Sequence, residues 1–167
     1  MDLTPYLPWL KFIHIVGAVA FVAGHGVSMF VAFRLRSERD PARMLALLDL
    51  SGASLGLATI GLLVLLVAGI VDGIVAGYFG QLWIWIALVG LIAIGASMTP
   101  LAIGHFNAIR AALGQRTRAM KPSDPDPTPR PIEEVIALAS SNRPQQLALI
   151  GGGGLLVILW LMTFKPF

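Results

Sequence analysis

Four long apolar runs without a single Asp, Glu, Lys or Arg constrain this chain more than any other feature. The runs are Phe12–Phe33, Leu50–Val71, Leu82–Ile109 and Leu147–Phe164. A helix needs about 20 residues to cross a hydrocarbon core of about 30 Å, and each run is close to or above that length. Hydrophobic residues make up 56% of the chain and its mean hydropathy is +0.79. We therefore expect an all-α, polytopic membrane protein with four transmembrane helices in an antiparallel bundle.

The chain of 167 residues leaves almost no room for a soluble domain beside the bundle. We expect one domain over residues 1–167, with spans at about 9–35, 46–77, 82–112 and 145–164. The proline-rich segment 121–131 predicts an extended, partly polyproline linker in the cytoplasm. Residues 132–141 predict a short surface helix that lies on the bilayer, with a docking site for a partner as the alternative.

The basic residues predict the orientation of the bundle. Ten of the 12 Lys and Arg residues follow the first or the third apolar run. Those two loops lie on one side of a four-span protein, and the positive-inside rule places such loops in the cytoplasm. We expect a multi-pass protein of a prokaryotic-type cytoplasmic membrane, with both termini extracytoplasmic.

Composition also limits the chemistry and the partners. The chain has no Cys, which excludes thiolate metal sites, iron–sulfur clusters and disulfides. The net charge of +3 does not indicate nucleic acid, because the basic residues border the spans and form no patch interleaved with aromatic residues. The expected partners are the lipid bilayer and other membrane-protein subunits.

Two histidines fall in the cytoplasmic half of the predicted bundle. His25 precedes Arg34 by nine residues and His105 precedes Arg110 by five, which places them about 14 Å and about 8 Å below the cytoplasmic edge. Ionisable groups at membrane depth usually serve function. Two imidazoles, nearby Phe residues and glycine-rich helices suit a b-type haem with His axial ligands between helices. Gly151–Gly154 suggest that a flat group lies against the fourth span.

A third histidine, His14, falls in the outer half with Asp72 and Lys11. His14 and His25 project from the same face of the first span, about 17 Å apart along its axis. The pattern predicts a hydrogen-bonded ion cluster of Lys11, His14 and Asp72. It could serve as a proton relay, a metal site, or a binding point for a quinone or a haem propionate. The alternative for each histidine is an interhelical hydrogen bond, worth about 0.6 kcal/mol in membranes.

The opening of the first span carries a family resemblance. Trp9-Leu10-Lys11-Phe12-Ile13-His14, followed by Phe21-Val22-Ala23-Gly24, resembles the first helix of the HemJ-type membrane proteins and of the copper-resistance-D-like and uncharacterised small four-helix families. The resemblance implies a four-helix bundle that binds b-type haem, with His14 as a candidate ligand and Lys11 beside it. HemJ-type enzymes oxidise protoporphyrinogen. The Arg and Tyr of that family are replaced here by His25-Gly26-Val27-Ser28, so the enzymatic activity is not carried over.

The sequence therefore favours a small integral membrane protein that binds haem b and works in electron transfer or as a redox subunit. The haem-iron candidates are His25, His105 and His14, with Lys11 and Asp72 as a polar cluster. A cofactor-free accessory subunit of a larger respiratory or photosynthetic complex is the alternative. A copper or other metal handler is a third reading, weakened because the methionines are scattered.

Overall fold

A computed structural model describes residues 3–167 and confirms the all-α class, since no strand occurs in that range. The first three spans are α1 (Leu7–Arg34), α2 (Pro41–Val75) and α3 (Leu82–Ala112). The fourth span is built from α5 (Arg143–Ala148), the π-helical turn η3 (Leu149–Gly153) and α6 (Gly154–Phe164). Short elements complete the chain: η1 (Thr4–Tyr6), η2 (Tyr78–Gly80) and α4 (Ile132–Ala139). Four helical stretches are long and apolar enough to cross a membrane.

The helix ends follow local sequence signals. α2 begins at Pro41, several residues before the expected span, because Asp40 caps it by accepting a hydrogen bond of 3.0 Å from the Ala42 backbone N–H. Pro41 then occupies the first helical position, where the missing N–H costs nothing. At the other end of α2, Gly77 adopts a left-handed conformation with φ of 72° and turns the chain towards α3.

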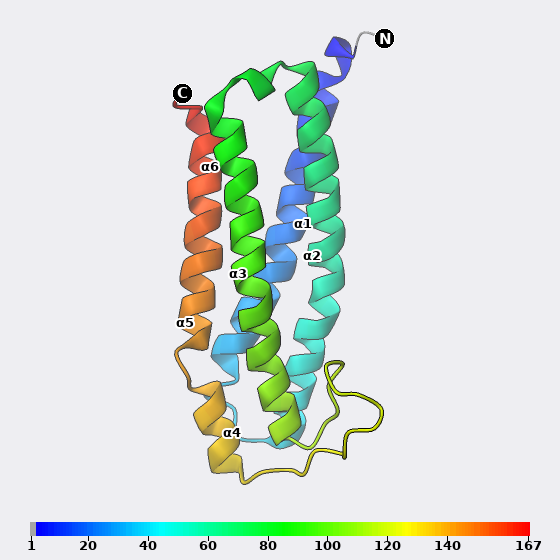
Figure 1. The fold of residues 1–167 in the computed structure, drawn as a ribbon, viewed down its shortest axis with the longest axis vertical. Coiled ribbons are helices and arrows are strands. Elements are labelled where there is room, and N and C mark those ends of the chain that lie inside the picture. Colours follow the sequence, from blue (N-terminus) through cyan, green and yellow to red (C-terminus); the bar gives the residue numbers. More distant parts are fainter. Residues whose placement is uncertain (1–2) are drawn as a thin grey trace.

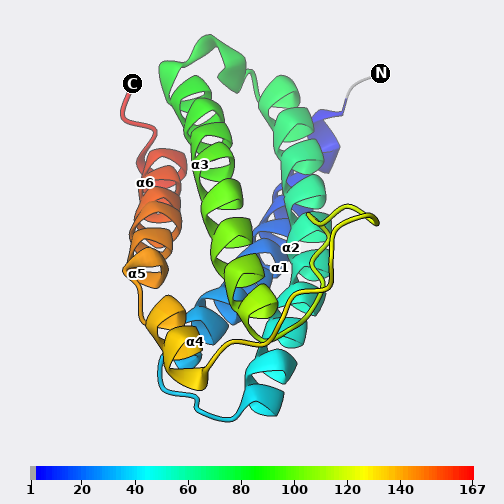
Figure 2. The same cartoon turned by 60° about the horizontal axis from the view of Figure 1, so that its bottom comes forward.

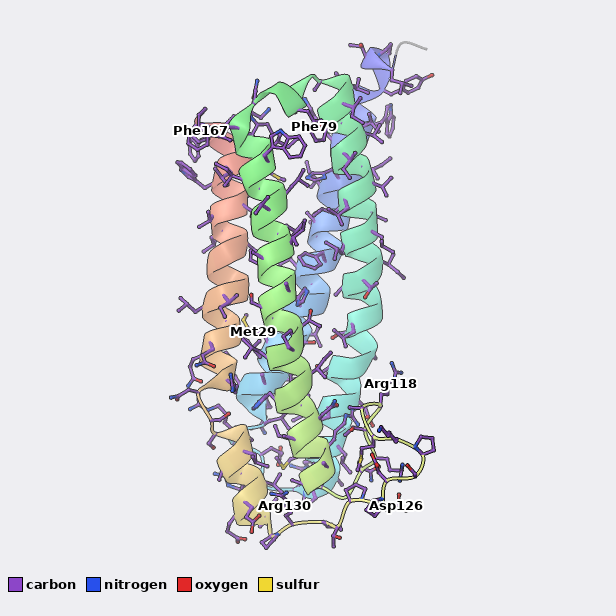
Figure 3. All side chains as sticks on the ribbon, viewed as in Figure 1. Met29, Phe79, Arg118, Asp126, Arg130 and Phe167 are labelled. Atoms are coloured by element: carbon purple, nitrogen blue, oxygen red, sulfur yellow. The ribbon has the colours of Figure 1, made fainter. Side chains whose placement is uncertain are left out.

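Successive spans run antiparallel, so the two ends of the molecule differ in character (Figure 1). Both termini lie at one end, which we call the terminal end, and the α1–α2 and α3–α4 connections lie at the other, which we call the base. Arg118, Asp126 and Arg130 lie at the base, whereas Phe79 and Phe167 lie at the terminal end (Figure 3). The two basic loops therefore share one end, as the four-span topology requires.

The spans associate as two pairs, α1 with α2 and α3 with α6. The α1–α2 seam follows a seven-residue repeat of small and apolar side chains on α1. At its centre, a Cβ added to Gly24 would lie 2.6 Å from the Ala58 backbone nitrogen, so the two backbones touch. Such close approach through small residues is how membrane helices gain packing energy without a hydrophobic driving force.

Two buried clusters hold the ends of the bundle. The base core joins α1, α2, α3 and α4, and consists of Val31, Leu35, Met44, Leu48, Ile109, Ala112, Val135 and Ala139. The terminal-end cluster joins α3 and α6, with Tyr78 and Phe79 of η2 packed against it, and consists of Trp83, Ile84, Ala87, Ile158 and Leu161. Between these clusters, α3 has no buried residue from Leu88 to Gly104. The two helix pairs are thus joined by the base core at one end and by the α2–η2–α3 hairpin at the other, where Gly73 lies against Phe79 and Ile84, and they share no buried cluster between.

The α3–α4 connection is a loop whose two ends meet, and its proline-rich segment 121–131, predicted to be extended, contains no helix or strand. The Arg130 backbone N–H donates to the Ala112 carbonyl at 2.8 Å, which brings the two ends of the loop together. Arg116 holds the interior by donating to the Asp126 carboxylate and to the Lys121 carbonyl, each at 2.7 Å. The loop extends from the base alongside α2 (Figure 2).

Candidate functional site

The three histidines occupy different surroundings, and His14 is the one fixed by a hydrogen bond. Its Nδ1 lies 2.8 Å from the Leu65 carbonyl oxygen on α2. A carbonyl only accepts, so Nδ1 carries a proton, and in the corresponding neutral tautomer the lone pair lies on Nε2. Gly69 makes room for the ring, because a Cβ there would lie 2.7 Å from His14 Nδ1. Histidines that ligate through Nε2 usually donate their Nδ1–H to a backbone carbonyl or carboxylate, which fixes the orientation of the ring.

The expected hydrogen-bonded cluster of Lys11, His14 and Asp72 is not formed. No hydrogen bond or ion pair joins these three residues within the part of the chain that the structure describes. Lys11 is exposed, and the Oδ1 atom of Asp72 is buried without a hydrogen-bond partner among residues 3–167. His14 takes its partner from the α2 backbone instead. Sequence spacing gives the depth of a residue in the bundle, but it cannot give the rotamer that decides which pairs meet.

His105 is the most buried of the three histidines. Its side chain on α3 is only 7% exposed, and its Nε2 is buried with no hydrogen-bond partner among residues 3–167. The ring packs beside Phe106, with the centroids 5.5 Å apart. A buried polar atom without a partner costs about 1–3 kcal/mol. His105 therefore carries an unused coordinating nitrogen in the interior of the bundle.

His25 lies on α1 at nearly the same depth as His105. Its ring meets Phe21 edge-on, with the centroids 4.5 Å apart. Between α2 and α3, Arg110 forms an ion pair with Asp49 at 2.8 Å. His105 lies five residues from Arg110 towards the terminal end, which makes it level with about Ser54 on the antiparallel α2. Ser54 in turn bonds Ser28 of α1 at 3.1 Å. His25 precedes Ser28 by three residues, so its offset from His105 along the bundle axis is about 5 Å.

Three serines form a polar cluster near the level of His25 and His105. This cluster was not predicted from the sequence. Ser51 donates to Ser28 at 3.0 Å, and Ser54 donates to the Ser51 carbonyl at 2.8 Å. Ser51 is buried. The Ser51-x-x-Ser54 spacing, which puts two hydroxyls on one helix face within an apolar run, was the available signal. The cluster joins α1 to α2 and uses its own hydroxyls internally.

Packing against α3 accounts for half of the Gly151–Gly154 run. A Cβ on Gly151 would lie 2.6 Å from the Sδ of Met98, and Gly154 abuts Ile94 in the same way. A Cβ on Gly152 would meet nothing within 4 Å in the described chain, and one on Gly153 would meet the Leu149 side chain of its own span at 4.0 Å. The π-helical turn over Leu149–Gly153 marks an irregular span, and such turns often occur at functional sites.

The donor set limits which metal groups the bundle could hold. No group of three or more His, Asp or Glu side chains suited to a metal ion occurs among residues 3–167. A bare metal ion needs about four protein ligands, whereas haem supplies four ring nitrogens itself and needs only one or two imidazoles. Within the described chain the histidines therefore offer single imidazoles, and the haem assignment stays a prediction.

The fold and these sites define the class of the molecule: an α-helical integral membrane protein with four spans and intramembrane histidines. A family model described as "Predicted integral membrane protein (DUF2269)" matches residues 8–166, and the chain belongs to this family. No curated protein and no solved structure matched the chain. The match confirms that the chain belongs to a family of membrane proteins. The resemblance to HemJ-type and copper-resistance-D-like proteins stays a prediction.

Proposed function

We propose that this protein binds a b-type haem between its two helix pairs and works in electron transfer or as a redox subunit. The observation that carries the proposal is the buried Nε2 of His105, which has no hydrogen-bond partner in the described chain. An axial bond from this nitrogen would use a lone pair that otherwise lowers the stability of the fold. Bound haem would supply a one-electron carrier within the membrane.

His25 is the proposed second ligand. It lies on the opposite helix pair, about 5 Å from the level of His105 along the axis. Phe21 and Phe106 pack beside the two imidazoles and supply apolar walls. The two pairs share no buried cluster above the base core, so a flat group could separate them at low cost in packing.

His14 is the alternative ligand, and it belongs to the terminal-end half of the bundle. Its Nδ1 bond to Leu65 leaves Nε2 as the coordinating atom, and the family resemblance implies the same residue. A haem at this level would lie close to Asp72, whose buried Oδ1 also has no partner in the described chain.

Absorption spectra of purified protein test the proposal. The dithionite-reduced parent should show the sharp α and β bands of six-coordinate b-type haem. His25→Ala and His105→Ala should each remove or shift the α band, since alanine leaves a coordination position empty. Asp72→Ala is the control and should leave the band in place. Thermal unfolding of each variant separates loss of ligand from loss of fold.

The other outcomes are equally specific. If His14→Ala alone removes the band, the haem lies at the outer site. If the parent has no haem band, or all three histidine variants match the parent, the cofactor proposal fails.

A cofactor-free accessory subunit is the second candidate, and one observation favours it. The stretch of α3 from Leu88 to Gly104 has no buried residue. A helix face left uncovered at membrane depth can pack against a larger complex as readily as against a cofactor. A parent without a haem band would leave this second candidate, with the histidines as interhelical hydrogen-bond donors.

A further inference from the structure

An open hollow of about 370 Å³ lies at the base of the α1–α2 pair, away from the three histidines. Its lining combines two arginines with apolar side chains: Arg34, Glu38, Arg43, Ala46, Leu47 and Leu50. The hollow is shallow and open to the surroundings, as a site for a lipid at the edge of the bundle would be. We propose that this hollow binds the phosphate group and the upper acyl chain of an anionic phospholipid.

The position of the hollow matches the boundary between headgroups and hydrocarbon. Arg34 is the last residue of α1, and Leu50 opens the apolar run of α2. Arg43 lies seven residues before Leu50, about 10 Å further from the membrane centre. The lining therefore changes from charged to apolar along the bilayer normal, in the order that a phospholipid molecule requires.

The two arginines retain unused donors for a phosphate. Arg43 is 74% exposed in its side chain and engages only its Nε with Asp40, at 3.4 Å. Its two terminal nitrogens bond nothing in the described chain. Arg34 donates to Ser37 at 2.7 Å and to Glu38 at 3.3 Å, and its Nε stays unused. Arginine suits phosphate because its planar guanidinium can donate two parallel hydrogen bonds.

Glu38 orients Arg34 rather than opposing a phosphate. Glu38 is only 8% exposed. Its carboxylate accepts hydrogen bonds from the Arg39 backbone N–H at 2.9 Å and from the Asp40 backbone N–H at 3.2 Å. Its negative charge is thus satisfied by the loop backbone and by Arg34. The 34–43 segment carries four Arg against one Glu and one Asp, so it keeps a net positive charge.

The test is lipid retention by the full chain. The protein is reconstituted in an equal mixture of phosphatidylglycerol and phosphatidylcholine, extracted in mild detergent, and its retained lipids are counted by native mass spectrometry. We expect severalfold preference for phosphatidylglycerol. Arg34→Gln with Arg43→Gln should reduce that preference about tenfold, as expected for loss of charge-assisted hydrogen bonds. The single variant Arg43→Gln, which touches only an exposed pair, should reduce it less and stay folded.

The matched control is Arg118→Gln with Arg130→Gln, which removes two charges from the same end of the molecule (Figure 3). This control should keep the preference. Equal retention of the two lipids, or equal loss in the control and the test variants, would overturn the site. Displacement of phosphatidylglycerol by millimolar inorganic phosphate would show that the arginines bind free phosphate and not a lipid. None of these readouts depends on haem.

Discussion

At the scale of single residues, the presence or absence of a Cβ decides how α1 meets α2. Gly24 and Gly26 are two residues apart on one helix, yet they face different surroundings. A Cβ on Gly24 would lie 2.6 Å from the Ala58 backbone nitrogen, whereas a Cβ on Gly26 would meet nothing within 4 Å. Only Gly24 is therefore required by packing.

Gly24→Ala should lower the stability of the bundle, because the backbone of α2 cannot yield as a flexible side chain would. The expected loss is about 1–3 kcal/mol, the usual cost of overpacking. Gly26→Ala is the matched control and should be neutral or stabilising by up to about 1 kcal/mol, since alanine favours helix. Thermal unfolding in detergent measures both. Equal destabilisation by the two variants would contradict the close seam.

Glu38 gives the α1–α2 loop a dependence on pH. The Arg39 backbone N–H, then the Asp40 N–H and the charges of Arg34 and Arg43, hold the pKa of Glu38 below its usual value against the opposing effect of burial. A lowered folded-state pKa means that the carboxylate contributes stability above the ordinary pKa of about 4.3. That contribution is lost as the pH falls through the lower pKa of the folded protein.

Glu38→Gln should therefore be less stable than the parent at neutral pH, with a difference that shrinks as the medium is acidified below pH of about 4. The measurement is the Tm of both proteins over a pH series. Glu133→Gln changes one charge without removing these backbone bonds and should show no such convergence. A constant difference from neutral to acid pH would mean that the carboxylate charge is not what holds the loop.

At the scale of elements, the spans were predictable and the connections were not. The bounds of α3 agree with the expected span at 82–112, because an uncharged apolar run leaves a membrane helix as the only way to satisfy its backbone. The ends of the loop after α3 are joined by the backbone bond from Arg130 to Ala112, and Arg116 holds its interior through bonds to residues five to ten positions away. α4 packs Val135 and Ala139 into the base core. The spacing of its apolar residues predicts a buried face but not the helices that this face meets.

Arg116→Gln should release the loop without unfolding the bundle. The change removes bonds to Asp124, Asp126 and Lys121, while the Arg130–Ala112 backbone bond and the packing of α4 persist. We expect severalfold faster cleavage of the loop by proteinase K and an unchanged Tm. Arg118→Gln is the control, since Arg118 bonds nothing in the described chain. Unchanged cleavage would show that the prolines alone fix the loop.

At the scale of the whole molecule, the sequence predicted which residues share a depth but not which of them meet. His25 and His105 were predicted to lie in the same half of the bundle, and helix rise counted from the Arg110–Asp49 ion pair and the Ser28–Ser54 hydrogen bond gives an offset of about 5 Å. The bond from His14 to Leu65 was not foreseeable, because any residue of α2 offers the same carbonyl and the seam register selects one. Lys11 and Asp72 share an end without pairing, for the same reason.

The last prediction concerns the orientation of the whole molecule. Both termini lie at one end and both basic loops at the other (Figure 1), so one measurement orients every element. Lys and Arg resist transfer across the membrane, and ten of the 12 lie in the two loops. A reporter fused after Arg118 should score as cytoplasmic, and one fused after Phe167 as extracytoplasmic. The reverse result would place His25, His105 and the arginine-lined hollow in the outer half. Signals on the same side from both fusions would contradict the four-span bundle itself.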